Sequence, residues 1–196
     1  MLPSSEACER NKGPILEVLR SAFAARTQVL EIGSGTGQHA VHFAAQLPHL
    51  TWHPTEQLAY LPDLAARVKL QGTPNLRPPT VLDVKQPRWP LRAVDAIFTA
   101  NTLHIMSWSE VTLMFHGFDA VLKPGGVLCI YGPFRYGGRY TSESNQDFDR
   151  MLQERDPKSG MRDFQDVTAL GQQQGLQLRA DHDLPANNRL LEFVKD

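Results

Sequence analysis

One stretch near the N-terminus, residues 28–38, restricts what this chain can fold into more than any other. Its first half, 28–32, is a short apolar run with β-branched members, which is typical of a buried strand. Glycines then alternate with other residues at Gly33, Gly35 and Gly37. Helical spacing resumes over 38–47. This order predicts a site where a ligand contacts backbone N–H groups at a helix start, and a tight turn without a ligand is the alternative.

The glycine spacing separates two classes of ligand. A dinucleotide fingerprint requires G-x-G-x-x-G, but here the third glycine comes one position early and Gln38 takes its place. Glu31 precedes the loop, and like charges make a carboxylate unfavourable beside a pyrophosphate. A ligand with an amino group and a sulfonium suits this acid, and S-adenosylmethionine is such a ligand. An NAD(P)-dependent oxidoreductase would share the sheet and is the rival interpretation.

Length and composition indicate one soluble α/β domain over 1–196, because 41% hydrophobic and 21% charged residues are ordinary for a globular protein. The net charge of −1 and the lack of a basic run argue against a broad nucleic-acid surface. Cys8 and Cys129 form no metal-binding pattern. No stretch reaches membrane-spanning length and no signal peptide is evident, so we expect a cytoplasmic protein whose oligomeric state is open.

The rest of the chain alternates strands with helices. Strands are predicted over 28–32, 50–54, 80–83, 94–100, 127–131, 176–184 and 189–194. Helices are predicted over 14–23, 38–47, 58–72, 107–122, 146–155 and 167–175, with residues 1–12 irregular and flexible. This rhythm predicts a Rossmann-like, doubly wound, mostly parallel seven-stranded sheet that ends in an antiparallel hairpin.

The long connection over 133–163 contains Gly137, Gly138 and several aromatic residues. Connections of this length are usually lids or binding loops, so we expect residues 133–163, with 1–12, to form a mobile cover over the site. Arg135 and Arg139 on this segment make an anionic acceptor plausible.

Several motifs together resemble class I S-adenosylmethionine-dependent methyltransferases. They are EIGSGTG over 31–37, Glu56, Asp83, LKPGG over 122–126 and the C-terminal hairpin. More narrowly, TANTLH over 99–104, YGPF over 131–134, SESN over 142–145 and PANN over 185–188 resemble an uncharacterised methyltransferase-like family shared by bacteria and animals. The resemblance covers nearly the whole chain.

The resemblance implies a role for each matching residue. The methionine end of S-adenosylmethionine would be held by Glu31, Gly33, Ser34, Gly35 and Gly37. Glu56 would accept hydrogen bonds from the ribose hydroxyls, Asp83 would face the adenine amine, and Asn101 would lie beside the reactive methyl group. Each has a structural alternative, since Glu56 could cap a helix, and Asp83 and Asn101 could close turns.

The acceptor is less well defined. Base-modifying methyltransferases usually follow the fourth strand with Asn or Asp, two prolines and an aromatic residue, whereas Asn101 is followed by TLH. This difference favours a small-molecule acceptor and leaves a protein acceptor open. His104 is the candidate general base, with an ordinary pKa near 6.5, and a purely structural hydrogen bond is its alternative. The residues predicted near the acceptor are Tyr131, Arg135, Tyr136, Arg139, Asn187 and Asn188. A protein that binds the cofactor without transferring methyl groups is a further alternative.

Overall fold

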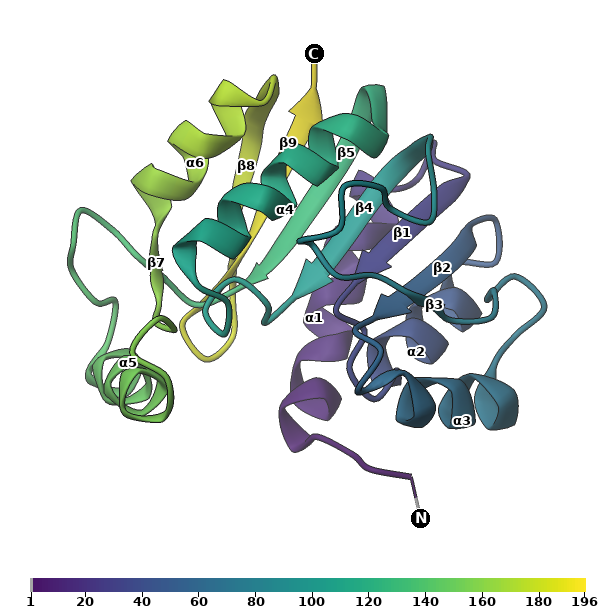
Figure 1. Cartoon of the computed structure of the whole chain (residues 1–196), viewed down its shortest axis with the longest axis horizontal. Helices are drawn as coiled ribbons and strands as arrows, with labels where there is room; N and C mark the ends of the chain where they lie inside the picture. The colour runs from purple at the N-terminus through teal and green to yellow at the C-terminus, as the bar shows by residue number, and fades with distance from the viewer. Residues whose placement is uncertain (1) are drawn as a thin grey trace.

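The computed structural model describes residues 2–196, and its centre is a seven-stranded sheet with the strand order β3-β2-β1-β4-β5-β9-β8 (Figure 1). The strands are β1 (Gln28–Ile32), β2 (Thr51–Glu56), β3 (Thr80–Val81), β4 (Val94–Ala100), β5 (Leu122–Gly132), β8 (Leu176–Leu184) and β9 (Asn188–Lys195). β3, β2, β1, β4 and β5 pair in parallel, and β9 is antiparallel to both β5 and β8. The predicted Rossmann-like sheet with its antiparallel hairpin is confirmed.

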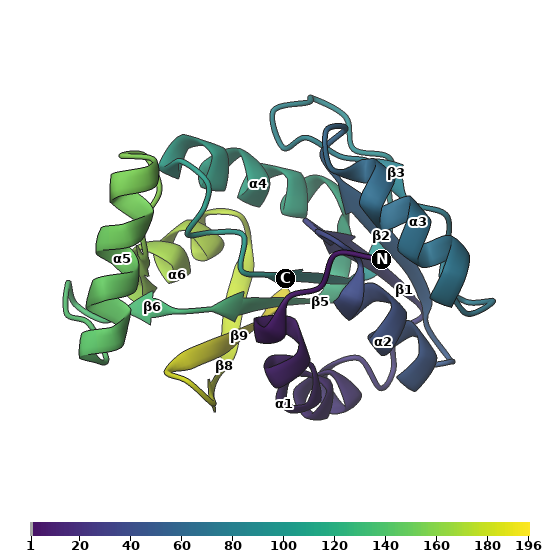
Figure 2. The ribbon, with the colours of Figure 1, turned by 90° about the horizontal axis from the view of Figure 1, so that it is seen from below.

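Helices cover both faces of the sheet (Figure 2). They are α1 (Glu6–Ala22), α2 (Gln38–Gln46), α3 (Leu61–Gln71), α4 (Trp108–Val121), α5 (Glu143–Arg155) and α6 (Phe164–Gln173). α1 and α2 pack on one face in a layer that includes Phe43, while α4 and α6 pack on the other in a layer that includes Phe115. Both layers are apolar, so the central strands are continuous hydrophobic runs with alternate side chains on opposite faces.

The strand order creates a crevice at the carboxyl edge of the sheet. β1 lies beside both β2 and β4, and the chain leaves β1 toward one edge and returns through β4 toward the other. Ligands of open α/β sheets bind outside the carboxyl ends of the strands at this kind of reversal. The motifs at the ends of β1, β2 and β4 therefore meet there.

The N-terminal segment differs from the prediction, because α1 begins at Glu6 and not at Pro14. Pro14 lies inside the helix, where it removes one backbone donor. The turns before Pro14 are mostly exposed, so they lack the apolar face that would mark a helix in the sequence. They extend beyond the carboxyl edge of the sheet (Figure 1).

β2 also continues past its predicted end at Pro54, to Glu56. Trp52, two residues earlier, directs its N–H to Asn75 O and not to β1. Pro54 has the same orientation in the strand, so its missing N–H costs no bond to β1. The prediction of a strand end at proline is wrong for this geometric reason.

The long connection is more ordered at its ends than predicted. β6 (Phe134–Arg135) and β7 (Arg162–Asp163) pair in parallel as a separate two-stranded sheet. α5 begins at Glu143, three residues before its predicted start, because the side chain of Ser142 accepts a hydrogen bond from Asn145 N at 3.1 Å. Strand pairs of two residues are too short to leave a periodic pattern in the sequence.

Candidate active site

A cleft of about 670 Å³ lies at the carboxyl ends of the parallel strands, where the sequence motifs predict a ligand. It is lined by residues at the carboxyl ends of four strands. These are Ile32–Thr36 at the end of β1, Glu56 and Gln57 at the end of β2, Leu82 and Val84 after β3, and Ala100–Thr102 at the end of β4. Ile105, Met106, Glu110 and Asp156 complete one side, and Ser5, Cys8, Gln38, His39, Tyr60 and Asp63 complete the other.

The three glycines after β1 have left-handed backbone conformations, with φ of 68°, 55° and 81°. A Cβ on Gly33 would lie 2.6 Å from Thr102 Cγ2, and one on Gly37 would lie 2.7 Å from Leu64 Cδ1. A Cβ on Gly35 would meet nothing within 4 Å. Gly33 and Gly37 therefore allow close packing, whereas Gly35 lines the cleft and leaves its space open.

Glu31 lies directly behind the glycine loop and is 2% exposed. Its Oε2 accepts a hydrogen bond from Trp52 Nε1 at 2.8 Å. Burial raises the pKa of Glu31 to about 7, and the Trp52 hydrogen bond opposes this rise. Glu31 itself does not line the cleft, so its carboxylate can affect a ligand there through its charge and not through direct contact.

Glu56 and Asp83 are placed differently. Glu56 lines the cleft, and its Oε2 accepts a hydrogen bond from Gly35 N at 2.7 Å, so the carboxylate points into the glycine loop. Asp83 does not line the cleft, although its neighbours Leu82 and Val84 do. Its Oδ1 accepts a hydrogen bond from Lys85 N at 2.9 Å. Asp83 therefore closes a turn in this structure, which is the structural alternative to a role in adenine binding.

Asn101 and His104 follow β4 on one short loop. Asn101 lines the cleft and has a φ of 57°, in the left-handed region that asparagine tolerates. A Cβ on Gly132 would lie 3.9 Å from Asn101 Oδ1 and 3.7 Å from His104 Nδ1, so both side chains face the end of β5. His104 is 6% exposed, and burial lowers its pKa to about 4, with the positive charge of Arg162 contributing. Its imidazole is therefore neutral at pH 7.

The residues predicted near the acceptor are absent from the lining of this cleft. Tyr131 is buried, Arg139 is exposed, and Tyr136 Oη donates to Asp181 Oδ2 at 2.8 Å. Asn187 O accepts a hydrogen bond from Asn145 Nδ2 at 3.2 Å, which joins the 185–188 turn to α5. Asn188 Nδ2 donates to Ala186 O at 3.2 Å, within the same turn. Of the narrower motifs, 99–104 therefore contributes to the lining of the cleft, whereas 142–145 and 185–188 contact each other outside it.

Both ends of the 133–163 segment are attached to neighbouring structure. Gly160 N donates to His104 O at 2.9 Å, and Ser159 Oγ donates to Ile105 O at 3.1 Å. Asp156 is the one residue of the segment that lines the cleft. Mobility of this cover stays a prediction.

Ser5, the residue before α1, and Cys8, in its first turn, also line the cleft. The sequence predicts residues 1–12 as part of a cover over the site but does not single out these two. Ser5 is held by Gln38, whose Oε1 accepts from Ser5 N at 2.6 Å and whose Nε2 donates to Glu9 Oε1 at 2.7 Å. The only sequence feature that points to this contact is Gln38, which occupies the position of the third glycine in a dinucleotide fingerprint.

The charges around the cleft have one sign. Its lining includes Glu56, Asp63, Glu110 and Asp156 but no lysine or arginine of the described chain. Ser34 Oγ, in the glycine loop, is buried without a partner of good hydrogen-bond geometry among residues 2–196, but it is close enough to Glu31 to oppose the rise in that carboxyl's pKa. An acidic cleft suits a cationic ligand and is unfavourable for a phosphate.

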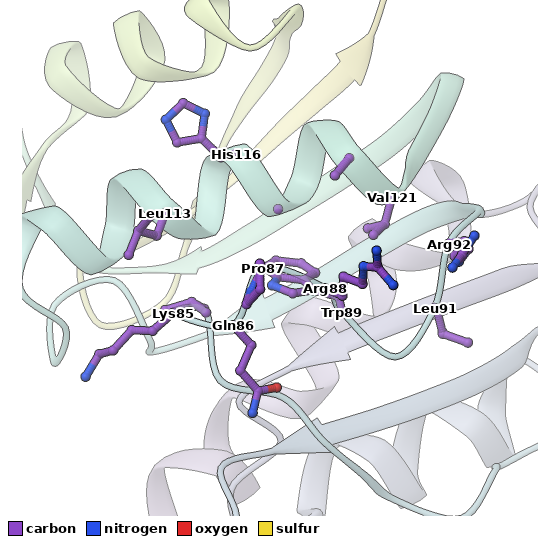
Figure 3. A pocket seen from close by; sticks show the side chains of 13 residues that line it. Lys85, Gln86, Pro87, Arg88, Trp89, Leu91, Arg92, Leu113, His116 and Val121 are labelled. Atoms are coloured by element: carbon purple, nitrogen blue, oxygen red, sulfur yellow. The ribbon is translucent and has the colours of Figure 1, made fainter.

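A second cavity, of about 610 Å³, lies between the 84–92 loop and α4 (Figure 3). Its wall includes Trp89, which leaves no room for a side chain on Gly117, because a Cβ there would lie 2.0 Å from the indole. Val84 lines both cavities. In Figure 3 the His116 side chain points away from the loop, and none of the predicted site residues lines this cavity.

Within the described residues, no helix has both the length and the apolar character needed to cross a membrane. Over the same residues, no group of three or more His, Cys, Asp or Glu side chains could hold a metal ion.

Solved structures of methyltransferases share this fold. An O-methyltransferase family protein from Burkholderia thailandensis has a TM-score of 0.82 at 16% identity, with 97% of this chain and 58% of that chain covered. The S-adenosylmethionine-dependent methyltransferase SibL in its apo form has a TM-score of 0.79 at 18% identity, covering 96% and 55%. PigF, solved with SAH, has a TM-score of 0.80 at 16% identity, covering 95% and 56%.

The chain therefore spans little more than half the length of these structures, which establish a class I methyltransferase fold. At the level of sequence, a family model matches residues 2–195. With nearly its whole length matched, the chain belongs to the family described as "Protein of unknown function (DUF938)".

Proposed function

We propose that this protein transfers a methyl group from S-adenosylmethionine to a small-molecule acceptor. The observation that carries the proposal is the cleft at the β1/β4 reversal, which has a glycine loop and four carboxylates but no lysine or arginine among its described lining residues. The methyltransferase fold of the structural neighbours supports it. No observation favours NAD(P)-dependent oxidation or cofactor binding without transfer. That the family occurs in both bacteria and animals stays a prediction.

The residues present fit the cofactor. Gly35 leaves room for it, and the Glu56 carboxylate would accept hydrogen bonds from the ribose diol. Glu31, behind the loop, would stabilise the cationic methionine end. Asn101 would lie beside the methyl group, and Leu82 and Val84 would contact the adenine. For Asp83 to contact the adenine amine, its carboxylate would have to give up the hydrogen bond from Lys85 N.

When bound, S-adenosylmethionine supplies an activated methyl carbon, whose bond to sulfur breaks as the bond to the acceptor forms. The protein aligns the acceptor and excludes water. His104 faces the end of β5 together with Asn101 and is neutral, so its imidazole can take the proton that a hydroxyl acceptor loses. The products are then the methylated acceptor, S-adenosylhomocysteine and a protonated imidazole that later releases its proton to water.

The ionisation of Glu31 gives an experimental test of this cofactor site. Because the pKa of Glu31 is about 7 in the free protein, this carboxyl is largely protonated at pH 6. A bound ammonium group favours the charged form, so binding should release up to one proton per site below pH 7. Affinity for S-adenosylhomocysteine should rise by up to about tenfold per pH unit below pH 7 and level off above it.

Calorimetry in two buffers of different ionisation enthalpy measures this proton release. The Glu31→Gln variant should show weaker binding and no proton release. Glu192→Gln is the matched control, since Glu192 is also a buried glutamate but pairs with His182 on the hairpin. Proton release that persists in Glu31→Gln would contradict the placement of the cofactor amino group.

A further inference from the structure

Arg135, the second residue of β6, is a half-buried cation. Its Nε is buried and has no hydrogen-bond partner among residues 2–196, although its guanidinium is close enough to the Tyr140 hydroxyl to oppose the rise in the pKa of that phenol. None of the ion pairs within residues 2–196 includes Arg135. Its guanidinium lies over the ring of Tyr140, 5.9 Å from the centroid. A partly desolvated guanidinium without an ion pair is costly, so an anion that bound Arg135 would stabilise this arrangement.

The carboxylates of this region already accept other hydrogen bonds. Asp163, the partner of Arg135 in the β6–β7 pair, accepts from Gly138 N at 2.6 Å and Gln165 N at 3.2 Å. Asp149 is 1% exposed, and it accepts hydrogen bonds from Tyr140 Oη at 2.6 Å, Met161 N at 2.6 Å and Gln153 Nε2 at 3.0 Å. A second guanidinium, that of Arg162, bonds the backbone carbonyls of Leu103, Met106 and Lys158. Burial lowers the pKa of Arg162, and the positive charge of Arg135 adds to this effect. The cluster therefore holds two cations and two carboxylates, and the hydrogen bonds of both carboxylates go to groups other than Arg135.

This cluster adjoins the proposed base. Phe134, which precedes Arg135, pairs with Arg162, and β6 begins two residues beyond Gly132 at the end of β5. Arg162 is close enough to His104 for its charge to affect the imidazole. Arg135 itself does not line the cofactor cleft.

We propose that the methyl acceptor is an anionic small molecule whose carboxylate or phosphate group binds Arg135 while its nucleophilic atom lies beside His104. This inference rests on the proposed methyltransferase function. The four carboxylates that line the cofactor cleft would repel such a group, so an anion must be bound outside that cleft, as Arg135 permits. A guanidinium suits either group, because it donates two parallel hydrogen bonds to the oxygens of a carboxylate or phosphate.

The test uses the full chain saturated with S-adenosylhomocysteine, which occupies the glycine loop. Thermal unfolding is followed as inorganic phosphate or acetate replaces chloride at constant ionic strength. One of these anions should raise the Tm of the wild type, and the anion with the larger effect identifies the group on the acceptor. In Arg135→Gln the apparent affinity should fall at least about tenfold, the loss expected for one hydrogen bond to a charged group. Arg139→Gln, an exposed arginine on the same segment, should behave as the wild type.

A second readout separates binding from a structural role. Without phosphate or acetate, Arg135→Gln should unfold at a higher temperature than the wild type, because it removes an unpaired charge near Arg162. A lower Tm would make Arg135 a structural residue and overturn the proposal, as would equal anion effects in all three proteins or none in the wild type. If S-adenosylhomocysteine itself fails to stabilise the wild type, the proposed function fails and the inference fails with it.

Discussion

Replacing Gly35 with valine should abolish the binding of S-adenosylhomocysteine and leave the sheet intact. Gly35 lines the cleft, and a Cβ there would meet no other atom within 4 Å, so the branched side chain would occupy the space that the cofactor needs. Its φ of 55° adds backbone strain of about 1–2 kcal/mol, which weakens folding without abolishing it. Calorimetric titration of the wild type and the variant measures the loss.

Gly125→Val is the matched control for this change. Gly125 also has a positive φ, of 72°, and also has open space around its Cβ position. It lies near the N-terminal end of β5, however, away from the carboxyl ends of the strands where the cleft is. Both variants should therefore lose similar stability, and only Gly35→Val should lose the ligand. Unchanged affinity in Gly35→Val would show that the cofactor does not pass over this loop.

Removing the imidazole of His104 should slow methyl transfer by about 10²-fold, at the lower end of the range for general base catalysis. A base with a pKa of about 4 is weak, which limits its contribution. The measurement is transfer of a labelled methyl group to the low-molecular-mass fraction of a cell extract by wild type and His104→Ala. His116→Ala is the control, since His116 is exposed on α4 and bonds Gln174. Affinity for S-adenosylhomocysteine should be nearly unchanged in both variants.

The pH profile of the wild type distinguishes the roles further. The sequence predicts a decline of activity below about pH 6.5, the value for an ordinary histidine. Burial lowers the pKa of His104 to about 4. Turnover that depends on neutral His104 should therefore decline only as the pH falls toward about 4. Normal turnover in His104→Ala would mean that the acceptor arrives already deprotonated. Loss of cofactor binding in that variant would make His104 part of the scaffold.

The mostly parallel sheet and its ligand-binding edge could be predicted because the apolar runs at 28–32 and 94–100 are buried on both faces and alternate with helical segments. Boundaries that depend on a neighbouring strand could not. Pro54 continues β2 because its missing N–H points away from β1, and no local pattern reports that orientation. β6 and β7 are two residues long and lie far apart in the sequence, so only the folded chain brings them together.

The glycine loop, Glu56 and Asn101 could be predicted as site residues because each follows a strand directly and parallel strands end at the same edge. Ser5 and Cys8 could not, since they reach the cleft through a hydrogen bond between Ser5 and Gln38, 33 positions later in the chain. The burial of His104 could not be predicted either, because its neighbours Phe148 and Arg162 come from the 133–163 segment, far away in the sequence.

The most direct test of the central claim is a calorimetric comparison of S-adenosylhomocysteine and NAD⁺ binding to the purified full chain at pH 7.5. The acidic lining around the glycine loop should admit the first and repel the pyrophosphate of the second. We predict saturable binding of S-adenosylhomocysteine and at least about tenfold weaker binding of NAD⁺, a difference of about 1.4 kcal/mol. Equal affinity or a preference for NAD⁺ would contradict the assignment of this cleft to S-adenosylmethionine.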